Sequence, residues 1–401
     1  MLTKIKWVLG LIVYKLAPVK KNRIVFQSYH GHYSDSPRYI SEYMRQQTHD
    51  YEQIWILNED GISRAPSNIH YVIAGSLRAK WVEGSAKVIV DNIYCDKEYT
   101  VYSDVKYSYY FARINCFFKK KKNQLAFTTF HGTPFKTQDR DTVNSTVIDF
   151  LCPGTEMILG NQFAVDVYRH ITFNKITMHL LGSPRNDVLF KADSKSKSRE
   201  LLKLDQNRKY LLYAPTFRNT GRDTAGKNVK RSGLEQLEQI DFNVLFDTLS
   251  DKFGGEWSII LRFHQYVSKM INWKELDQKY EGRFINGNIH DEMADYLAAV
   301  DILMTDYSSS AFDFSLTGRL CLIYANDLEY FVSNERGLYI PLDNLPFPYA
   351  IDFEGLIKII QEFDPITYSN NIMKMHREFG YVDDEKSTKR VSEYIFERLK
   401  E

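Results

Sequence analysis

The sequence has few cysteines, almost no net charge and no long apolar run, and each absence excludes a class of protein. Its 401 residues include four widely spaced cysteines with no Cys-x-x-Cys pair, so neither a disulfide framework nor a thiolate zinc site is expected. The formal net charge of +1 gives no overall attraction to nucleic acid, and no binding of nucleic acid is expected. No carboxylate cluster stands out, so we expect no catalytic metal and no cofactor.

The longest apolar stretch near the amino terminus, residues 7–17, is too short to span a bilayer, because a spanning helix needs about 20 apolar residues. Its charge and length also suit a signal peptide, but no small-residue cleavage site follows it. We expect residues 1–22 to form an amphipathic helix that lies on an anionic membrane surface, and the alternative is an ordinary first helix packed on its domain. The flanking basic residues are Lys4, Lys6, Lys20, Lys21 and Arg23.

From residue 23 onward, short strand-like runs alternate with helical stretches, a pattern typical of parallel sheets covered on both faces. A chain of this length is also too long for one ordinary core. We therefore predict an α/β fold of two doubly wound, Rossmann-like lobes, residues 23–180 and 181–401, with the ligand bound between them. The predicted strands are residues 23–29, 53–57, 70–74, 87–91, 125–130, 148–152, 175–181, 210–214, 257–263, 300–304 and 320–324. The predicted helices are residues 234–253, 291–299, 309–317 and 384–399.

The most informative motif is His-Gly-Thr-Pro-Phe-Lys-Thr at residues 131–137, directly after a predicted strand. Open α/β folds place their ligands at the carboxyl ends of strands. Histidine is the side chain best suited to proton transfer near neutral pH, so His131 is a candidate base. Gly132, Thr133 and Lys136 supply a flexible backbone, a hydroxyl and a cation beside it. A plain strand-end turn with a solvated histidine is the alternative for this segment taken alone.

Further cations and hydroxyls follow other predicted strands. Arg185 lies in Gly-Ser-Pro-Arg-Asn-Asp at residues 182–187, and it either grips a phosphate or bridges the lobes. Thr216 and Arg218 end the strand before a polar stretch that we predict to be a loop near the ligand. Arg262 and His264 fall on one face of their strand, and two neighbouring cations suit a diphosphate better than a core.

Residues 304–314 combine a strand end, a serine cluster and a helix. Thr305 and Asp306 end the strand, and Ser308, Ser309 and Ser310 precede the helix. The first turn of a helix presents unpaired N–H groups, so this segment predicts an anion pocket that needs no metal. Capping alone accounts for one of the serines.

Together and in this order, these motifs resemble the CDP-glycerol glycerophosphotransferase family, and residues 28–37, 335–339 and 345–348 extend the resemblance over about residues 23–390. The resemblance implies a GT-B-like fold at the cytoplasmic face of the bacterial membrane. It also implies transfer of glycerol phosphate from CDP-glycerol to an undecaprenyl-linked polyol-phosphate or saccharide acceptor, with release of CMP. Family members build or prime teichoic acids and related capsule polymers.

The resemblance assigns roles to single residues. His131 matches the family's general base, and His264 matches a histidine that engages the donor diphosphate. Ser308 and Ser309 match phosphate ligands at a helix terminus. The implied lobes are an acceptor-side lobe at residues 23–180 and a CDP-donor lobe at residues 181–401.

The expected reaction is an in-line displacement at the β-phosphorus of CDP-glycerol. Arg262, His264 and the helix near Ser308 would stabilise the departing CMP phosphate. Lys136 would hold the acceptor's phosphate, and Asp306 would orient a serine or the cytidine ribose.

Some features leave the acceptor and the donor open. Phe130 stands where the family commonly has Trp, and residues 346–348 read Pro-Phe-Pro where the family has Pro-Gly-Pro. The chain lacks the long amino-terminal extension of some family polymerases, so a primase or a short-chain elongase is expected. The alternatives are a CDP-ribitol transferase, a GT-B glycosyltransferase that uses a nucleotide sugar, and a non-catalytic membrane scaffold. A second membrane contact at residues 119–122 competes with a solvated loop.

Overall fold

The chain forms two compact units, seen here in a computed structural model that describes residues 2–28, 31–92, 121–130, 132–137, 154–171, 176–216, 237–263, 265–335 and 337–401. The first unit comprises Met1–Thr133, Gln138–Asp187 and Gly380–Glu401. The second unit comprises Pro134–Thr137 and Val188–Phe379. The sequence placed residues 181–401 in one lobe, whereas the structure places the last 22 residues with the first unit.

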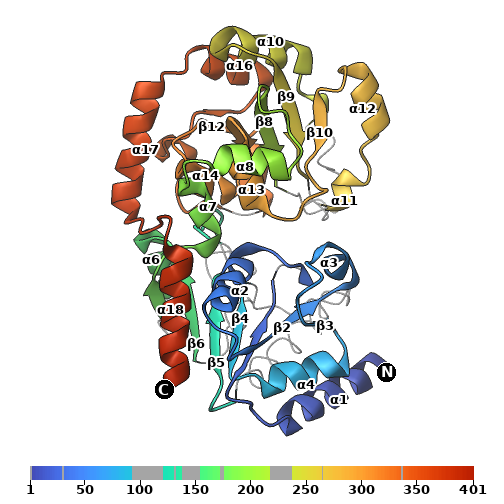
Figure 1. The fold of residues 1–401 in the computed structure, drawn as a ribbon. Coiled ribbons are helices and arrows are strands. Elements are labelled where there is room, and N and C mark those ends of the chain that lie inside the picture. The colour runs from blue at the N-terminus through green and yellow to red at the C-terminus, as the bar shows by residue number, and fades with distance from the viewer. Residues whose placement is uncertain are drawn as a thin grey trace. The chain divides into compact units, whose positions relative to one another are not determined.

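The first unit is built on a parallel sheet of seven strands in the order β3-β2-β1-β4-β5-β6-β7 (Figure 1). The order reverses between β1 and β4, which is the mark of a doubly wound sheet. The strands are β1 Arg23–Phe26, β2 Glu52–Leu57, β3 Tyr71–Ile73, β4 Val88–Asp91, β5 Leu125–Thr128, β6 Thr155–Leu159 and β7 Thr177–Leu180. The predicted strand at residues 148–152 lies outside the described residues, and β6 was not predicted.

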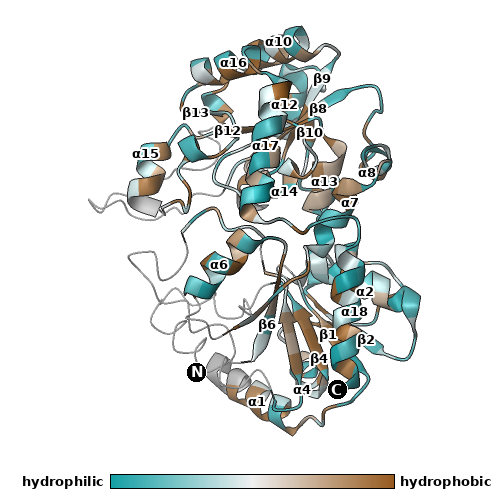
Figure 2. Cartoon of the chain, turned by 90° about the vertical axis from the view of Figure 1, so that its left-hand side faces the viewer, coloured by the Kyte–Doolittle hydropathy of each residue, from teal (hydrophilic) through white to brown (hydrophobic). Residues whose placement is uncertain are grey.

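Alternating side chains of these strands fill two separate cores. Ile24 and Phe26 face a core that helices α2 and α18 cover, and Val25 faces a core that α4 covers. Figure 2 shows the strands as mainly hydrophobic between helices of mixed hydropathy. The α/β fold with helices on both faces is thus confirmed. The helices of this unit are α1 Leu2–Leu16, α2 Asp35–Gln47, α3 Glu59–Arg64, α4 Leu77–Ser85, α6 Gln162–Ile171 and α18 Ser387–Lys400, with the 3-10 turn η5 Pro184–Asn186.

Helix α1 packs on α4 with one side and exposes apolar side chains on the other. Tyr14 is buried, and its hydroxyl donates to Gln124 Oε1 at 2.7 Å. A Cβ at Gly84 would lie 2.2 Å from the carbonyl oxygen of Tyr14, so only glycine permits this close approach. The structure therefore shows the first helix packed on its domain. Among the helices of the described segments, none is both long and apolar enough to cross a bilayer. The exposed apolar residues of α1 are Val8, Leu9, Ile12 and Leu16.

The second unit is built on a parallel sheet of six strands in the order β10-β9-β8-β11-β12-β13. The order reverses between β8 and β11, so this sheet is also doubly wound. The strands are β8 Lys209–Ala214, β9 Trp257–Leu261, β10 Phe284–Asn286, β11 Ile302–Thr305, β12 Cys321–Tyr324 and β13 Tyr349–Ala350. The short strands β10 and β13 were not predicted, because three and two residues carry too little pattern.

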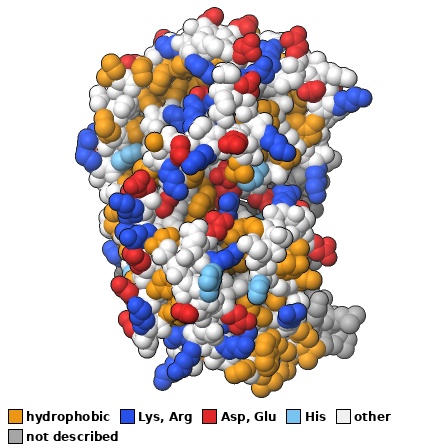
Figure 3. Space-filling view, viewed as in Figure 1, with side chains coloured by type: hydrophobic (Ala, Val, Ile, Leu, Met, Phe, Trp, Pro, Cys, Tyr) orange, Lys and Arg blue, Asp and Glu red, His pale blue; other side chains and the backbone are white. Residues whose placement is uncertain are grey.

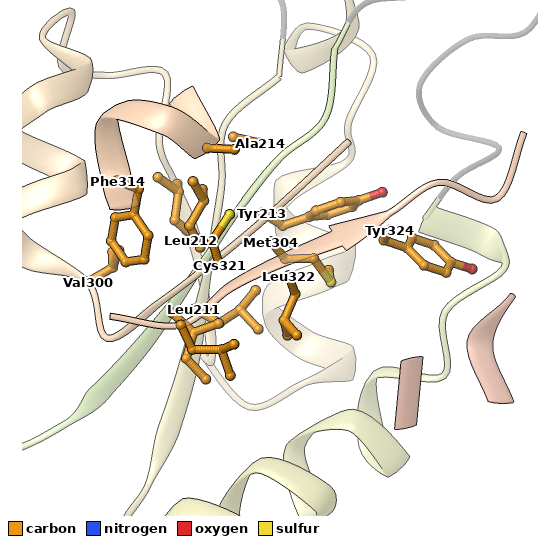
Figure 4. Close-up of a cluster of buried hydrophobic side chains, with 14 of the residues drawn as sticks. Leu211, Leu212, Tyr213, Ala214, Val300, Met304, Phe314, Cys321, Leu322 and Tyr324 are labelled. Atoms are coloured by element: carbon orange, nitrogen blue, oxygen red, sulfur yellow. The ribbon is translucent and has the colours of Figure 1, made fainter. Parts of the chain in front are cut away.

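The core of the second unit is one continuous cluster. Figure 4 shows Leu211, Tyr213, Met304, Cys321 and Leu322 within it, on neighbouring strands. The helices of this unit are α7 Asp187–Phe190, α8 Ser194–Leu201, α10 Phe242–Phe253, α11 Gln265–Ser268, α12 Trp273–Lys279, α13 Met293–Ala299, α14 Ser310–Ser315, α15 Leu328–Tyr330, α16 Phe353–Gln361 and α17 Pro365–Phe379. A π-helical turn, Phe331–Glu335, and a 3-10 turn, Leu342–Asn344, complete the unit.

Helix α18 is held on the first unit by a buried carboxylate. Glu156 of β6 lies 2.8 Å from Nε2 of His179, and it accepts from the Tyr394 hydroxyl at 2.7 Å and from Nη2 of Arg398 at 2.9 Å. Burial raises the pKa of Glu156, but the hydrogen bonds from His179 and Tyr394 and the charge of Arg398 outweigh this and hold the pKa below its usual 4.5. The carboxylate therefore stabilises the docked helix while it stays ionised.

This carboxylate makes stability depend on pH in the acid range. A carboxyl group whose pKa is lower in the folded state contributes its full stabilisation above its unfolded pKa of about 4.5. This stabilisation is lost as pH falls through the lower pKa of the folded state. The difference in free energy of unfolding between the wild type and Glu156→Gln should shrink as pH falls below about 4.5. Urea unfolding at pH 7, 5 and 4 measures it. Glu256→Gln, at an exposed glutamate, is the control and should show no such change. A difference for Glu156→Gln that stays constant over this range would contradict the assignment.

Candidate active site

The segment before residue 131 leaves strand β5 through a strained turn. Phe130 has a φ of 45° and Gly132 has a φ of 91°. Residues other than glycine rarely adopt positive φ values. The ring of Phe130 packs edge-to-face on Tyr168 of α6, with centroids 5.0 Å apart. The Tyr168 hydroxyl donates to the carbonyl oxygen of Gly132 at 3.1 Å. Non-glycine strain of this kind persists only where the surroundings hold it, and it is found at functional sites.

The next residue, Thr133, is fixed to the same unit. The Asn161 amide donates to Thr133 Oγ1 at 2.6 Å, and the Tyr381 hydroxyl lies 3.3 Å from the same oxygen. Asn161 Oδ1 in turn accepts from the backbone N–H of Ala164 at 2.8 Å, so this side chain also caps α6. The sequence prediction missed Asn161, although an asparagine before an amphipathic stretch is a capping signal.

Residues 134–137 belong to the second unit. Phe135 is buried, and its ring lies edge-to-face on Phe312 of α14 at 5.3 Å between centroids. The carbonyl oxygen of Phe135 accepts from Tyr339 N–H at 3.0 Å, and Thr137 N–H donates to Gly337 O at 2.8 Å. Lys136 forms the intervening antiparallel bridge with Leu338. The chain next to residue 131 is therefore held on the first unit, at Phe130, Gly132 and Thr133, and residues 135–137 are held on the second.

At the carboxyl edge of the second sheet, Thr305 and Asp306 join two strand ends. The Thr305 hydroxyl donates to Ala214 O at 2.6 Å, and Asp306 Oδ1 accepts from Thr216 N–H at 2.8 Å and Tyr307 N–H at 2.6 Å. Both side chains are fully buried. These contacts fix the loop after β8 to the loop after β11, and substrate contacts of Thr216, Thr305 and Asp306 stay predictions.

The serine cluster lies beside them, before α14. Ser310 donates through its hydroxyl to Ser308 Oγ at 2.9 Å and through its N–H to the same atom at 3.3 Å. Ser309 occupies the N-cap position without a side-chain cap bond. Ser308 and Ser309 are half-buried, whereas Ser310 is buried. Ser308 and Ser309 are therefore the partly exposed residues of this cluster.

Arg262 binds a loop. Its guanidinium donates to the carbonyl oxygens of Gly287, His290 and Asp291 at 2.5–2.6 Å and lies 4.9 Å from the Tyr296 ring centre. Burial raises the pKa of the Tyr296 hydroxyl, and the Arg262 charge opposes that rise. A diphosphate role for Arg262 stays a prediction, because these carbonyls already take up much of its donor capacity.

Asn288 holds the same loop against the end of β9, and no sequence pattern indicated this role. Its side-chain amide donates to Phe263 O at 2.5 Å and accepts from Phe263 N–H at 3.1 Å. The backbone directly before residue 264 is thereby fixed.

The motif at residues 182–187 forms a junction inside the first unit. The Arg185 guanidinium pairs with the Asp35 carboxylate at 3.2 Å, and the Asp187 carboxylate accepts from the first N–H groups of α18 at Ser387 and Thr388. Burial raises the pKa of Asp187. Asp35 itself has a φ of 59°. A phosphate contact by Arg185 stays a prediction, and the structure gives this side chain a carboxylate partner.

Three predicted site residues, His131, Arg218 and His264, lie outside the described residues, so their roles also stay predictions. Within the described segments, no group of three or more His, Cys, Asp or Glu side chains is placed to hold a metal ion.

Known proteins share this architecture and are 24–28% identical in sequence. A solved structure of the wall teichoic acid polymerase TagF superposes with a TM-score of 0.77 at 24% identity, covering 99% of this chain and 96% of that one. A teichoic acid poly(glycerol phosphate) polymerase of Bacillus spizizenii is 28% identical over 95% of this chain and 93% of its own length. One of Staphylococcus epidermidis is 27% identical over 96% of this chain but only 52% of its own length.

The two doubly wound units and the likeness to TagF define a fold of the GT-B type. Residues 11–397 match the family CDP-glycerol:poly(glycerophosphate) glycerophosphotransferase. The chain belongs to this family, and the resemblance found in the motifs is confirmed.

The contacts of Arg262 predict that its replacement lowers the stability of the fold more than the binding of CDP-glycerol. Arg262→Lys keeps the charge but cannot donate to three carbonyls, so the free energy of unfolding should fall by about 2 kcal/mol. CDP-glycerol should still raise the melting temperature of the variant. Urea unfolding and thermal shift measure both effects. Arg208→Lys, at an exposed pair with Glu256, is the control and should change stability by less than about 0.5 kcal/mol. Suppose instead that Arg262→Lys has the wild-type free energy of unfolding, but CDP-glycerol no longer raises its melting temperature. Arg262 would then be a residue that binds the donor.

Proposed function

We propose that this protein transfers glycerol phosphate from CDP-glycerol to a lipid-linked polyol-phosphate or saccharide acceptor and releases CMP. The family match over residues 11–397 carries the proposal. The anchoring of Phe130 before residue 131 and of Gly132 and Thr133 after it supports the proposal, because a general base acts only when it is held in place. The acceptor we propose is undecaprenyl-linked, and the protein works at the cytoplasmic face of the membrane.

The donor, in this proposal, is bound by the second unit and the acceptor by the first. Ser308 and Ser309 are partly exposed residues with hydroxyls at the carboxyl edge of the second sheet, where doubly wound folds bind phosphates. Asp306 fixes the backbone next to them, so these hydroxyls are preorganised. His264 follows a backbone position that Asn288 fixes, and we assign it to the donor diphosphate.

The proposed chemistry is one in-line displacement. A hydroxyl oxygen of the acceptor forms a bond to the β-phosphorus of CDP-glycerol, and the bond from that phosphorus to the bridging oxygen breaks. CMP leaves with the electron pair, and His131 accepts the proton of the attacking hydroxyl. Positioning and charge stabilisation supply most of the catalysis in such a transfer, so no covalent step on the protein is required.

A donor panel tests this function. Purified protein, with a lipid-linked acceptor, should incorporate radiolabel from CDP-glycerol and not from CDP-ribitol or UDP-sugars. His131→Ala should fold normally and lower CMP release by about 10²–10⁴-fold, the usual contribution of a general base. Transfer of label from a UDP-sugar would replace the proposal with a glycosyltransferase. Near-normal turnover by His131→Ala would remove this residue from the mechanism.

We infer that the outer face of α1 contacts an anionic membrane. The exposed apolar side chains of α1 lie beside two more on α4, Leu77 and Trp81, and hydrophobic atoms gather over these helices at the lower edge of Figure 3. Lys15 and Lys20 are exposed on the same segment. An apolar stripe with lysines beside it is the pattern of helices that lie in the membrane interface.

Surface substitutions test this contact without disturbing the buried Tyr14. Ile12→Glu with Leu16→Glu should reduce co-sedimentation with phosphatidylglycerol vesicles at least about tenfold, because two charges enter the apolar stripe. Ile366→Glu is the control, since Ile366 is 73% exposed, like Leu16 at 71%, but belongs to the second unit. Activity on a water-soluble acceptor analogue should persist in the double variant. Unchanged sedimentation would place the membrane contact elsewhere, with residues 119–122 as the next candidate.

A further inference from the structure

In the first unit, polar residues follow both strands at which the strand order of the sheet reverses. Ser28 comes two residues after β1, and Asn92 comes directly after β4. The Gln27 N–H donates to Val90 O at 3.1 Å, so the parallel ladder continues beyond the end of β1. Carried one residue further, the same register places Ser28 beside Asn92. Doubly wound sheets bind their ligands outside the carboxyl ends of the strands at such a reversal.

Asn92 carries a buried amide that the chain does not satisfy. The residue is 0% exposed, and among the described residues neither Nδ2 nor Oδ1 of its side chain has a hydrogen-bond partner. Burial of an unpaired amide costs free energy, and most buried polar groups in folded proteins have a partner. An amide kept at the ligand-binding edge of a sheet in spite of this cost indicates a partner from outside the chain.

Two serine hydroxyls lie at the same edge. Val88 and Val90 face the core that α2 and α18 cover, so strand alternation places Asn92 next on that face. Ser28 Oγ lies 3.3 Å from Oγ of Ser34, the N-cap residue of α2, and the Ser34 side chain makes no cap bond. One O–H of the two serines serves their contact, and the other is left to donate. We call Ser28, Ser34 and Asn92 the switch-point cluster, and all three belong to the first unit.

The switch-point cluster consists of neutral groups that match neighbouring hydroxyls. A side-chain amide offers N–H donors and a carbonyl acceptor side by side, so one hydroxyl can accept from Nδ2 while the next donates to Oδ1. The charge of the neighbouring Asp35 is compensated by Arg185 at 3.2 Å. A phosphate would be bound more strongly by charged donors than by this set, so the cluster favours an alcohol.

We propose that the switch-point cluster binds the hydroxyl-bearing end of the acceptor, with Asn92 hydrogen-bonded to two neighbouring hydroxyls. The inference rests on the proposed function, in which the first unit binds the acceptor, and it names the chemical group that this unit recognises. Neighbouring hydroxyls occur at the glycerol end of a polyol phosphate and also on a saccharide. The experiment therefore compares acceptors of both kinds.

Asn92→Leu removes both polar atoms and keeps a side chain of similar size. Its melting temperature should stay the same or rise, because an apolar group replaces an unpaired buried amide. Calorimetry should show at least about a tenfold higher Kd for one of two water-soluble acceptor analogues, one ending in glycerol phosphate and one in a disaccharide. The analogue that responds identifies the acceptor end. The Kd for CDP-glycerol should stay within about twofold. A lower melting temperature, or an unchanged Kd for both analogues, would overturn the proposal.

A deoxy version of the responding analogue tests the recognised group. For the glycerol analogue this is a propanediol end, which keeps the terminal hydroxyl and lacks its neighbour. The wild type should bind the deoxy version at least about tenfold more weakly than the parent, whereas Asn92→Leu should bind the two alike. Equal binding of parent and deoxy version by the wild type would contradict recognition of neighbouring hydroxyls.

Gln124→Met is the matched control, because Gln124 is also a buried amide of the first unit, 1% exposed. It directly precedes β5, at the opposite edge of the sheet, and both ends of its amide are hydrogen-bonded. Its Nε2 donates to the carbonyl oxygens of Glu83 and Ala86, and its Oε1 accepts from the Tyr14 hydroxyl. Gln124→Met should lower the melting temperature and leave the acceptor Kd near the wild-type value. An equal loss of acceptor affinity in this variant and in Asn92→Leu would make the effect structural and overturn the proposal.

Direct binding separates this inference from the proposed function. If the wild type transfers label from a UDP-sugar, the proposed donor is wrong, and the acceptor Kd of Asn92→Leu still decides on the switch-point cluster. Transfer from CDP-glycerol together with unchanged acceptor affinity in Asn92→Leu would refute the cluster alone.

Discussion

Parallel strand pairing is the constraint on which the rest of this protein depends. In a parallel sheet all carboxyl ends meet at one edge, so segments far apart in sequence are gathered there without any contact being specified between them. In the second unit this brings Thr216 after β8 next to Asp306 after β11, although 90 residues separate them. In the first unit it places the loop after β5 beside Asn161 after β6. Both units thus gather polar side chains at one edge of a buried apolar sheet.

Several charged side chains at these edges bind the protein itself. Arg262 donates to three carbonyl groups, Arg185 pairs with Asp35, and Asp306 accepts two backbone N–H groups. A buried charge without partners is costly, and these partners offset that cost while they stiffen the loops. Rigid loops suit phosphoryl transfer, in which the protein mainly positions groups and stabilises charge.

The sequence predicted the class of fold because the buried strands are nearly continuous apolar runs, as at Val88–Asp91 and Lys209–Ala214. It missed β6, whose Glu156 breaks the apolar pattern and is explained by partners that include Tyr394 and Arg398, 238 and 242 residues away. The motifs marked the correct strand ends, and the family they indicated is confirmed. The partners of Arg185 and Arg262 were not predictable, because long-range packing selects them and no local spacing encodes it. The assignment of Gly380–Glu401 to the first unit depends in the same way on Asp187, which caps α18 from a distant turn.

The central claim is a single direct displacement by the acceptor, with the protein providing a base and no covalent intermediate. The stereochemical course at phosphorus tests it most directly, with CDP-glycerol made chiral by sulfur at the β-phosphorus and the configuration of the product phosphodiester determined. One in-line displacement predicts inversion. Retention would require two successive displacements, and it would contradict the account by placing a phosphoryl group on the protein during turnover.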